Sequence, residues 1–437
     1  MGALLPFLTL PDPLTTGEGA LDPLGLSMIG DRLADQILPG LRARMSRPRF
    51  LSAIAVSAAV CEGLEERPAA DGITPDYLVF EWLVVEAFVR EGDREKTLRT
   101  PGTQKAQDVR DSGERMCARA YLKTPTVFGF HGIYKPLARN LGIVDDDLRL
   151  SDRGYELLKI WQTEQGLDGF LDSAAGEGPG RSIRQTLCSA VEDGLAAGYT
   201  SRGGGWQGWS ILARHLPPAD SGPKEAAYLL NILRDQEAAP RGEVFDLLST
   251  VGSESDASEQ DLAQNLLIPK AGQDLAGRLK AIVAYEQVCG VLEEGFDWIR
   301  YLSTHSRDRP VGADTFARDG RGRELAAELP KKIAAAEQAL SIAPLHVQQM
   351  FAQLAKGFDG VRDAPGLFEA VLARHQDVQQ AKPPEGKRSW FDRDAGGATI
   401  VRIPYRVTER PESEHVWSRP YRISTALSFL DDLKSRA

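Results

Sequence analysis

Two pairs of acidic residues near the N-terminus have types and spacings that suit acid–base chemistry. Asp31 and Asp35 are four residues apart, so on a helix their carboxylates project from one face. Glu81 and Glu86 interrupt a strongly apolar stretch, where an unpaired charge is costly to bury. Paired carboxylates can divide the roles of general acid and general base, or hold a cation. We therefore expect the candidate catalytic residues to be Glu81, Glu86, Asp31 and Asp35.

Structural explanations of both pairs stay open. Two acids near a helix N-terminus interact favourably with the helix dipole while they face water, which accounts for Asp31 and Asp35 without chemistry. For Glu81 and Glu86 we favour an ion pair with an arginine from the basic patch at 42–49, and a pocket with a perturbed carboxyl group is the functional alternative.

Four arginines form a local basic patch that suits contact with phosphates. They lie between Asp35 and Glu62 with no acidic residue among them. The formal net charge of -10 opposes indiscriminate binding to a polyanion, so any nucleic-acid contact has to be local. The alternative is a solvated set of helix faces and loops. The four residues are Arg42, Arg44, Arg47 and Arg49.

Residues 124–165 have the order of elements found in a small winged-helix unit. Apolar residues at spacings of three and four predict a helix that starts near Pro136 and is closed by Gly142. The alternation at 148–150 predicts a half-buried strand, and Ser151 can cap a second helix. The inward positions are Tyr134, Leu137, Ala138 and Leu141 in the first helix, and Tyr155, Leu158 and Trp161 in the second. Its candidate nucleic-acid contacts are Lys135, Arg139 and Arg149.

Basic and aromatic residues alternate near the C-terminus, which is typical of surfaces that contact bases and phosphates. The candidates are Lys387, Arg388 and Trp390, beside one or two edge strands predicted over 399–406. The alternative is a tail whose aromatic side chains dock on the body of the protein.

Length and periodicity predict a mainly α, multidomain helical protein with a central winged-helix-like module and a small C-terminal α+β element. The chain has 437 residues, which is too long for one typical core. We expect a helical N-terminal domain at 1–120, the winged-helix-like module at 121–215, a helical domain at 216–380 and the strand–helix element at 381–437. The final helix is expected at 424–433.

Several classes of protein are not indicated. The four cysteines and six histidines are widely separated, so we expect reduced thiols and no metal site. Serine-hydrolase and P-loop motifs do not occur, and we expect no cofactor. No signal-peptide pattern or membrane-length apolar run is present, so we expect a cytoplasmic, bacterial protein that does not enter a membrane.

The segment 21–50, LDPLGLSMIGDRLADQILPGLRARMSRPRF, resembles an uncharacterised bacterial family associated with phage-defence loci. The shared features are an Asp and Gly turn, a helix that ends at Pro39 and Gly40, and a basic stretch before an apolar helix. The resemblance covers about a tenth of the chain and implies an antiphage setting, with protein partners from the same locus. It transfers no catalytic residue.

These patterns favour a DNA-associated protein that binds double-stranded DNA through the winged helix and the arginine patch, and the resemblance implies that this DNA is phage-derived. A DNA-processing enzyme with a carboxylate-based site, either a base-excising glycosylase or a nuclease, is the alternative. A protein-interaction scaffold is the third hypothesis.

Overall fold

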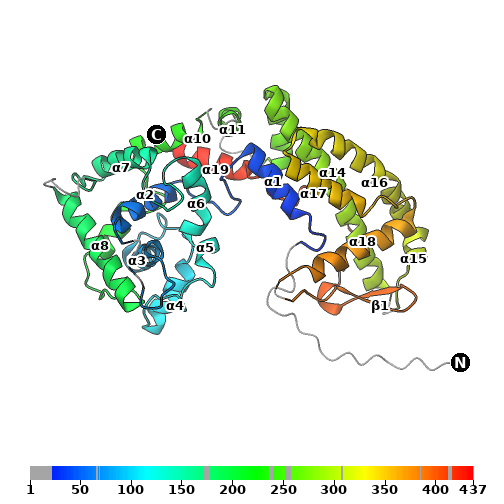
Figure 1. Cartoon of the computed structure of the whole chain (residues 1–437), viewed down its shortest axis with the longest axis horizontal. Coiled ribbons are helices and arrows are strands. Elements are labelled where there is room, and N and C mark those ends of the chain that lie inside the picture. The colour runs from blue at the N-terminus through cyan, green and yellow to red at the C-terminus, as the bar shows by residue number, and fades with distance from the viewer. Residues whose placement is uncertain are drawn as a thin grey trace. The chain divides into compact units, whose positions relative to one another are not determined.

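The structure is a computed structural model that describes residues 22–64, 67, 69–171, 178–235, 240–250, 257–306, 309–383, 385–411 and 416–436. It is mainly helical, and its described strands form one two-stranded sheet, which confirms the expected mainly α, multidomain class with a small C-terminal α+β element (Figure 1). Within the described ranges, no helix combines the length and the apolar character needed to cross a bilayer.

The chain forms two compact units. Unit 1 combines Met1–Leu33 with Gly272–Pro420, and unit 2 combines Ala34–Ala271 with Tyr421–Ala437. The division between them falls inside helix α1 (Ser27–Ile37), whose apolar side chains Ile29, Leu33 and Ile37 are buried. The four expected ranges follow chain order, whereas these units do not. The C-terminal helix, for example, packs with unit 2, while residues 381–420 before it belong to unit 1.

Unit 2 is built around two helices that are buried on nearly all sides. Almost every residue of α2 and most of α3 are buried, as their continuous apolar runs predict. Figure 1 shows both helices enclosed by the surrounding ones. The helices of this unit are α2 (Phe50–Cys61), α3 (Asp76–Glu91), α4 (Thr103–Ser112), α5 (Pro125–Phe128), α6 (Phe130–Asn140), α7 (Asp152–Glu164), α8 (Pro179–Ala197), α9 (Gly208–His215), α10 (Pro223–Leu233), α11 (Arg241–Leu248), α12 (Glu259–Asp261), the π-helix Leu262–Leu267, α13 (Ile268–Lys270) and α19 (Ile423–Lys434).

Helix α6 begins earlier than the sequence predicts. It starts at Phe130 and carries Pro136 in its interior, so the expected start near Pro136 is wrong. Burial of the aromatic residues in its first turns, Phe130 and Tyr134, outweighs the cost of a proline inside the helix. The expected end is confirmed, because Gly142 follows the helix with a φ of +69°.

The predicted strand at 148–150 does not form. A single bridge joins Val144 to Leu150, and Leu148 has a φ of +64°. The Asp145 carboxylate accepts hydrogen bonds from the backbone N–H groups of Asp147 and Arg149, which bends the chain into a turn instead. Helix α7 follows Ser151 as expected, but Tyr155 is 48% exposed and does not pack inward.

Unit 1 is organised by the 33-residue helix α14, which packs against α16 and α18. Strands β1 and β2 pair antiparallel, with Phe391 opposite Val401. The predicted strand region at 399–406 is confirmed only in its first residues, because the chain turns into a 3-10 helix afterwards. The elements of this unit are α14 (Gln273–His305), α15 (Ala313–Arg318), α16 (Gly320–Ala339), the 3-10 helix Leu340–Ile342, α17 (Leu345–Lys356), α18 (Ala364–Gln380), β1 (Phe391–Arg393), β2 (Thr399–Val401) and the 3-10 helix Ile403–Tyr405.

Candidate functional site

Glu81 lies at the centre of unit 2 and is fully buried. Its Oε1 accepts a hydrogen bond from the Tyr121 hydroxyl at 2.7 Å. Its Oε2 accepts one from the His131 backbone N–H at 2.9 Å and faces His131 Nδ1 at 3.0 Å. The carboxylate is therefore held by Tyr121 and His131, from two separate segments, and not by an arginine as we expected.

His131 is 2% exposed, and only one of its two ring nitrogens has a hydrogen-bond partner among the described residues. Because Nδ1 faces a carboxylate, the proton of the neutral ring resides on Nδ1 and is donated to Glu81. Nε2 is then a lone-pair acceptor, and it is buried without a hydrogen-bond partner among the described residues. A carboxylate at Nδ1 also orients the histidines of general-base catalysis, but here Nε2 is buried.

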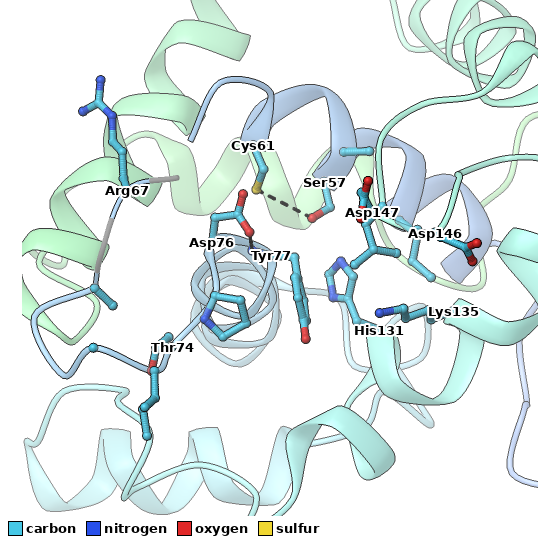
Figure 2. A pocket seen from close by; sticks show the side chains of 17 residues that line it. Ser57, Cys61, Arg67, Thr74, Asp76, Tyr77, His131, Lys135, Asp146 and Asp147 are labelled. Atoms are coloured by element: carbon cyan, nitrogen blue, oxygen red, sulfur yellow. Dashed lines mark hydrogen bonds between the residues drawn. The ribbon is translucent and has the colours of Figure 1, made fainter. Parts of the chain in front are cut away.

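His131 forms part of the wall of a pocket of about 370 Å³, here called the α2–α3–α6 pocket. Figure 2 shows the side chains of Ser57, Tyr77 and His131 directed towards a common space, whereas Arg67 points away. The Ser57 hydroxyl also lies 4.0 Å from Cys61 Sγ, on the same helix. The pocket therefore brings a hydroxyl, a thiol, a phenol and an imidazole together from α2, α3 and α6.

Burial changes the acid–base properties of groups around this pocket. Burial, and then the charge of Glu81, raise the pKa of Tyr77. The same two causes raise the pKa of Tyr121 well above its usual range, so it remains a neutral donor to Glu81. Burial and the nearby Arg139 lower the pKa of Lys135, which lies one turn after His131 on α6.

The other candidate carboxylates lie elsewhere. Glu86 forms a structural ion pair with Arg90 at 2.7 Å along α3, so its partner comes from its own helix and not from the basic patch as we expected. Asp31 is exposed on the part of α1 that belongs to unit 1. Burial by itself raises the pKa of Asp35, but hydrogen bonds and charges from Arg422 and Arg42 outweigh it and lower that pKa. None of the three lines the α2–α3–α6 pocket.

The arginine patch is divided between core and surface. Arg49 is 2% exposed and bonds Glu225 together with the carbonyl oxygens of Pro217 and His215. Arg49 is therefore a core residue, and its expected role in phosphate contact is corrected here, because its guanidinium cannot be reached from outside. The sequence missed this because the acidic partner is 176 residues away.

The remaining arginines of the patch keep some exposure. Arg42 pairs with Asp35 at 2.8 Å, and Arg47 pairs with Asp432. Arg44 is exposed, and its guanidinium lies 4.5 Å above the ring of Phe128, which is itself 43% exposed. Arg44 and Phe128 thus present a cation and an aromatic ring together at the surface.

The cations of α6 and the following turn lie partly at the surface. Lys135 is half-buried, and its Nζ lies 5.9 Å from the centre of the Tyr77 ring. Arg139 bonds the carbonyl oxygens of Asp145 and Asp146, and one third of its side chain is exposed. Arg149 is exposed in the same turn.

The C-terminal aromatic cluster belongs to the core of unit 1. Trp390 is 8% exposed and stacks on Tyr405 at 4.4 Å. The expected role of Trp390 in contacting bases is corrected here, because its ring is buried against the aromatic rings of Phe296, His375 and Tyr405. Arg388 pairs with Asp392 at the surface, and Lys387 is half-buried. The alternative, in which the aromatic side chains dock on the helical body, describes this region.

The residue that completes the pocket, His131, was missed by sequence reasoning. A single histidine at a helix start carries no spacing signal, since its partner Glu81 is 50 residues away. The only available hint was the charge of Glu81 inside an apolar helix.

The chain was compared with protein-family models, curated proteins and solved structures. No family model, curated protein or solved structure matches the chain. Among the residues that the structure describes, no three His, Cys, Asp or Glu side chains gather to hold a metal ion. The four cysteines, all within the described ranges, form no disulfide.

Proposed function

We propose that this chain is a DNA-associated protein that contacts the phosphate backbone with cations around α5 and α6. The observation that carries the proposal is the exposed pair of Arg44 and Phe128, which places a guanidinium and an aromatic ring on one surface. Such pairs suit both phosphates and bases, because the cation attracts the backbone and the ring offers a stacking face.

Helix α6 supplies further positive charge next to α5. Lys135 and Arg139 are one turn apart on its partly exposed face, where a DNA-reading helix of a winged-helix-like module would carry its contacts. Asp145, Asp146 and Asp147 follow in the turn, so the proposed surface is small and its net charge modest. We therefore expect weak, strongly localised binding.

A salt titration tests this proposal. Binding of a fluorescent 30-base-pair duplex is measured by anisotropy for the whole chain, Arg44→Ala and Arg139→Ala. Each substitution is expected to weaken binding and to reduce the slope of log K against log salt by about one. Arg278→Ala is the matched control, since Arg278 pairs with Asp274 on α14 of the other unit. Equal losses in control and variants, or no binding at low salt, would refute the proposal.

The phage-defence resemblance of segment 21–50 extends the proposal to phage DNA in a bacterial cytoplasm. It predicts that a bacterium expressing the chain with its neighbouring genes plates a sensitive phage less efficiently. Arg44→Ala is expected to restore plating, whereas Arg278→Ala is not. Unchanged plating with the intact chain would contradict the extension.

A DNA-processing enzyme is the second candidate function, because Glu81 lies behind a histidine that forms a pocket wall. Incubation with ordinary and phage-modified DNA, followed by alkali, measures base removal. Strand breaks that Glu81→Gln abolishes favour the enzyme. Intact DNA with a retarded band favours binding alone, and neither result favours an interaction scaffold.

A further inference from the structure

Residues 202–206 form a glycine-rich turn, here called the glycine turn, at the surface of unit 2. The Trp206 backbone N–H donates to the Gly203 carbonyl oxygen at 3.1 Å and closes the turn. Gly203, Gly204 and Gly205 are exposed, and within the described part of the chain their backbone N–H groups donate to no acceptor. Successive N–H groups in a turn can together bind an anion. The glycine turn therefore presents unused donors at a surface that a ligand can reach.

Neither packing nor backbone conformation requires glycine at these three positions. An added Cβ would meet open space at Gly203 and Gly205, and only an ordinary contact with Arg90 Nη1, at 3.8 Å, at Gly204. None of the three has a φ in the left-handed region. The missing side chains instead leave the backbone uncovered, which lets a ligand approach its N–H groups closely.

Neighbouring segments hold the glycine turn at both ends. Before the turn, the Thr200 backbone N–H donates to the Met116 carbonyl oxygen at 2.9 Å. After it, α9 packs on α3 and buries the Trp209 ring, whose Nε1 donates to the Gly203 carbonyl oxygen at 2.9 Å. The turn is thus positioned before a ligand binds, which lowers the entropic cost of binding.

Three guanidinium groups from different segments lie at the glycine turn. Arg115 Nη1 donates to the Arg202 carbonyl oxygen at 2.5 Å, at the start of the turn. Arg90, at the end of α3, brings its Nη1 to 3.8 Å from the Cβ position of Gly204. The third group is that of Arg202 itself, which lies 5.7 Å from the centre of the Trp206 ring. Guanidinium groups suit phosphates because their N–H donors match two phosphate oxygens at once.

The positive charge at the turn is only partly neutralised. Carboxylates of α3 and α8 pair with Arg90 and Arg202. Arg115 is exposed and forms no ion pair within the described ranges. Asp111 and Glu114, which precede Arg115 in the chain, are exposed and reduce the long-range attraction. An anion is therefore attracted at short range, and we expect weak binding of a single charged group.

We propose that the glycine turn, together with Arg90, Arg115 and Arg202, binds a phosphate group. The backbone N–H groups of the three glycines donate to phosphate oxygens, and the guanidinium groups neutralise the charge. The same chemistry serves a small phosphorylated molecule and the phosphodiester of a nucleic-acid strand. The inference goes beyond the proposed function, because the glycine turn shares no residue with the surface around α5 and α6.

NMR of the glycine amides in the whole chain tests the site. The chain is labelled with ¹⁵N-glycine, and Gly203→Ala, Gly204→Ala and Gly205→Ala assign the three resonances of the turn. Inorganic phosphate, added at constant ionic strength against chloride, is expected to shift these resonances with a dissociation constant in the millimolar range. The absence of phosphate-dependent shifts at these glycines would overturn the proposal.

Two further ligands distinguish the sources of the phosphate. If a short DNA duplex shifts the same resonances and inorganic phosphate competes with it, a nucleic-acid strand supplies the group. If adenosine monophosphate shifts them and the duplex does not, the ligand is a small phosphorylated molecule. Both results support the phosphate site. Because Arg44→Ala removes a contact of the α5–α6 surface only, phosphate shifts that persist in this variant separate the site from the proposed function.

Variants test the two kinds of donor separately. Arg115→Ala is expected to weaken phosphate binding about tenfold, whereas Arg234→Ala, at a partly exposed arginine elsewhere in unit 2, leaves it unchanged. Gly205→Val is also expected to weaken it, because the branched side chain covers the backbone donors; Gly360→Val, in equally open space in unit 1, is its control. Circular dichroism shows whether each variant folds. Unchanged phosphate binding in both Arg115→Ala and Gly205→Val would place the phosphate elsewhere and end the proposal.

Discussion

Arg49 and Glu225 form an ion pair in which both side chains are almost completely buried. Two further donors of Arg49 bond carbonyl oxygens, so the guanidinium is well satisfied in the core. Removing one partner leaves the other charge buried and uncompensated. Arg44 and Arg42, five and seven positions earlier, keep exposed side chains, so burial alone separates the members of the patch.

Arg49→Met is expected to lower the free energy of unfolding by about 3–5 kcal/mol, because the buried Glu225 side chain then loses its ion-pair partner. Arg42→Met is the control, since the Arg42–Asp35 pair is partly exposed and such pairs contribute about 0–1 kcal/mol. Urea denaturation measures both. Similar losses in the two variants would show that Arg49 is not held as described.

His375 gives unit 1 a defined pH dependence. Burial lowers the pKa of His375 to about 4, from an ordinary value of 6.5. Nδ1 donates to the Pro23 carbonyl oxygen, and Nε2 accepts from the Trp390 backbone N–H, so only the neutral ring satisfies both bonds. Below pH 6.5 the unfolded chain takes up a proton that the folded chain refuses.

The contribution of His375 to stability is therefore complete above pH 6.5 and is lost as the pH falls towards 4. The shift in pKa corresponds to a loss of roughly 3 kcal/mol over this window. Unfolding free energies of the native chain and His375→Gln are compared at pH 7, 6, 5 and 4. The difference between them is expected to shrink as the pH falls, and a constant difference would contradict the assigned tautomer.

At the scale of elements, the candidate site depends on a close crossing of α5, α6 and α3. A Cβ atom at Gly129 would collide with Glu81 Oε1, and one at Gly132 would collide with the backbone of Thr126. These two glycines let α6 approach closely enough for His131 to reach Glu81. The sequence predicts that helices exist here, but it does not show which glycines mark a close approach.

Gly132→Ala tests this crossing. Alanine favours a helix by up to about 1 kcal/mol over glycine, so improved stability is the outcome if only local propensity matters. We expect a loss of about 1–3 kcal/mol instead, because the added methyl group overpacks the contact with α5. Gly320→Ala, at a helix start with open space around it, is the control. Thermal unfolding measures both.

At the scale of the whole molecule, the C-terminal helix α19 completes unit 2. Its apolar face is buried, and α19 packs on α10 and α11. Ion pairs add to this packing, with Arg422 on Asp35 and Asp432 on Arg47. Chain order therefore does not follow unit membership, because the residues of unit 1 come between α13 and α19.

Truncation after Pro420 is expected to destabilise unit 2 by more than about 5 kcal/mol, since several large apolar side chains of α19 lose their burial. Hydrogen exchange in α10 and α11 is expected to accelerate strongly. Exchange in α16 serves as the internal control, because this helix belongs to unit 1. Unchanged exchange in α10 and α11 would show that α19 contributes little.

The sequence by itself determined the elements whose signal is local. The final helix expected at 424–433 is α19, and Gly142 ends α6 where expected. The sequence also directs attention to Glu81, because a carboxylate inside an apolar helix needs a partner.

The tertiary structure alone decided which charges are buried, which glycines permit contact and which residues meet. Glu81 with His131, Arg49 with Glu225, and Asp35 with Arg422 are separated by 50, 176 and 387 residues. Each of these pairings forms because packing brings distant segments together and a buried charge takes the nearest suitable group. Local spacing carries no record of such long-range partners, and for that reason the candidate site emerged only from the folded chain.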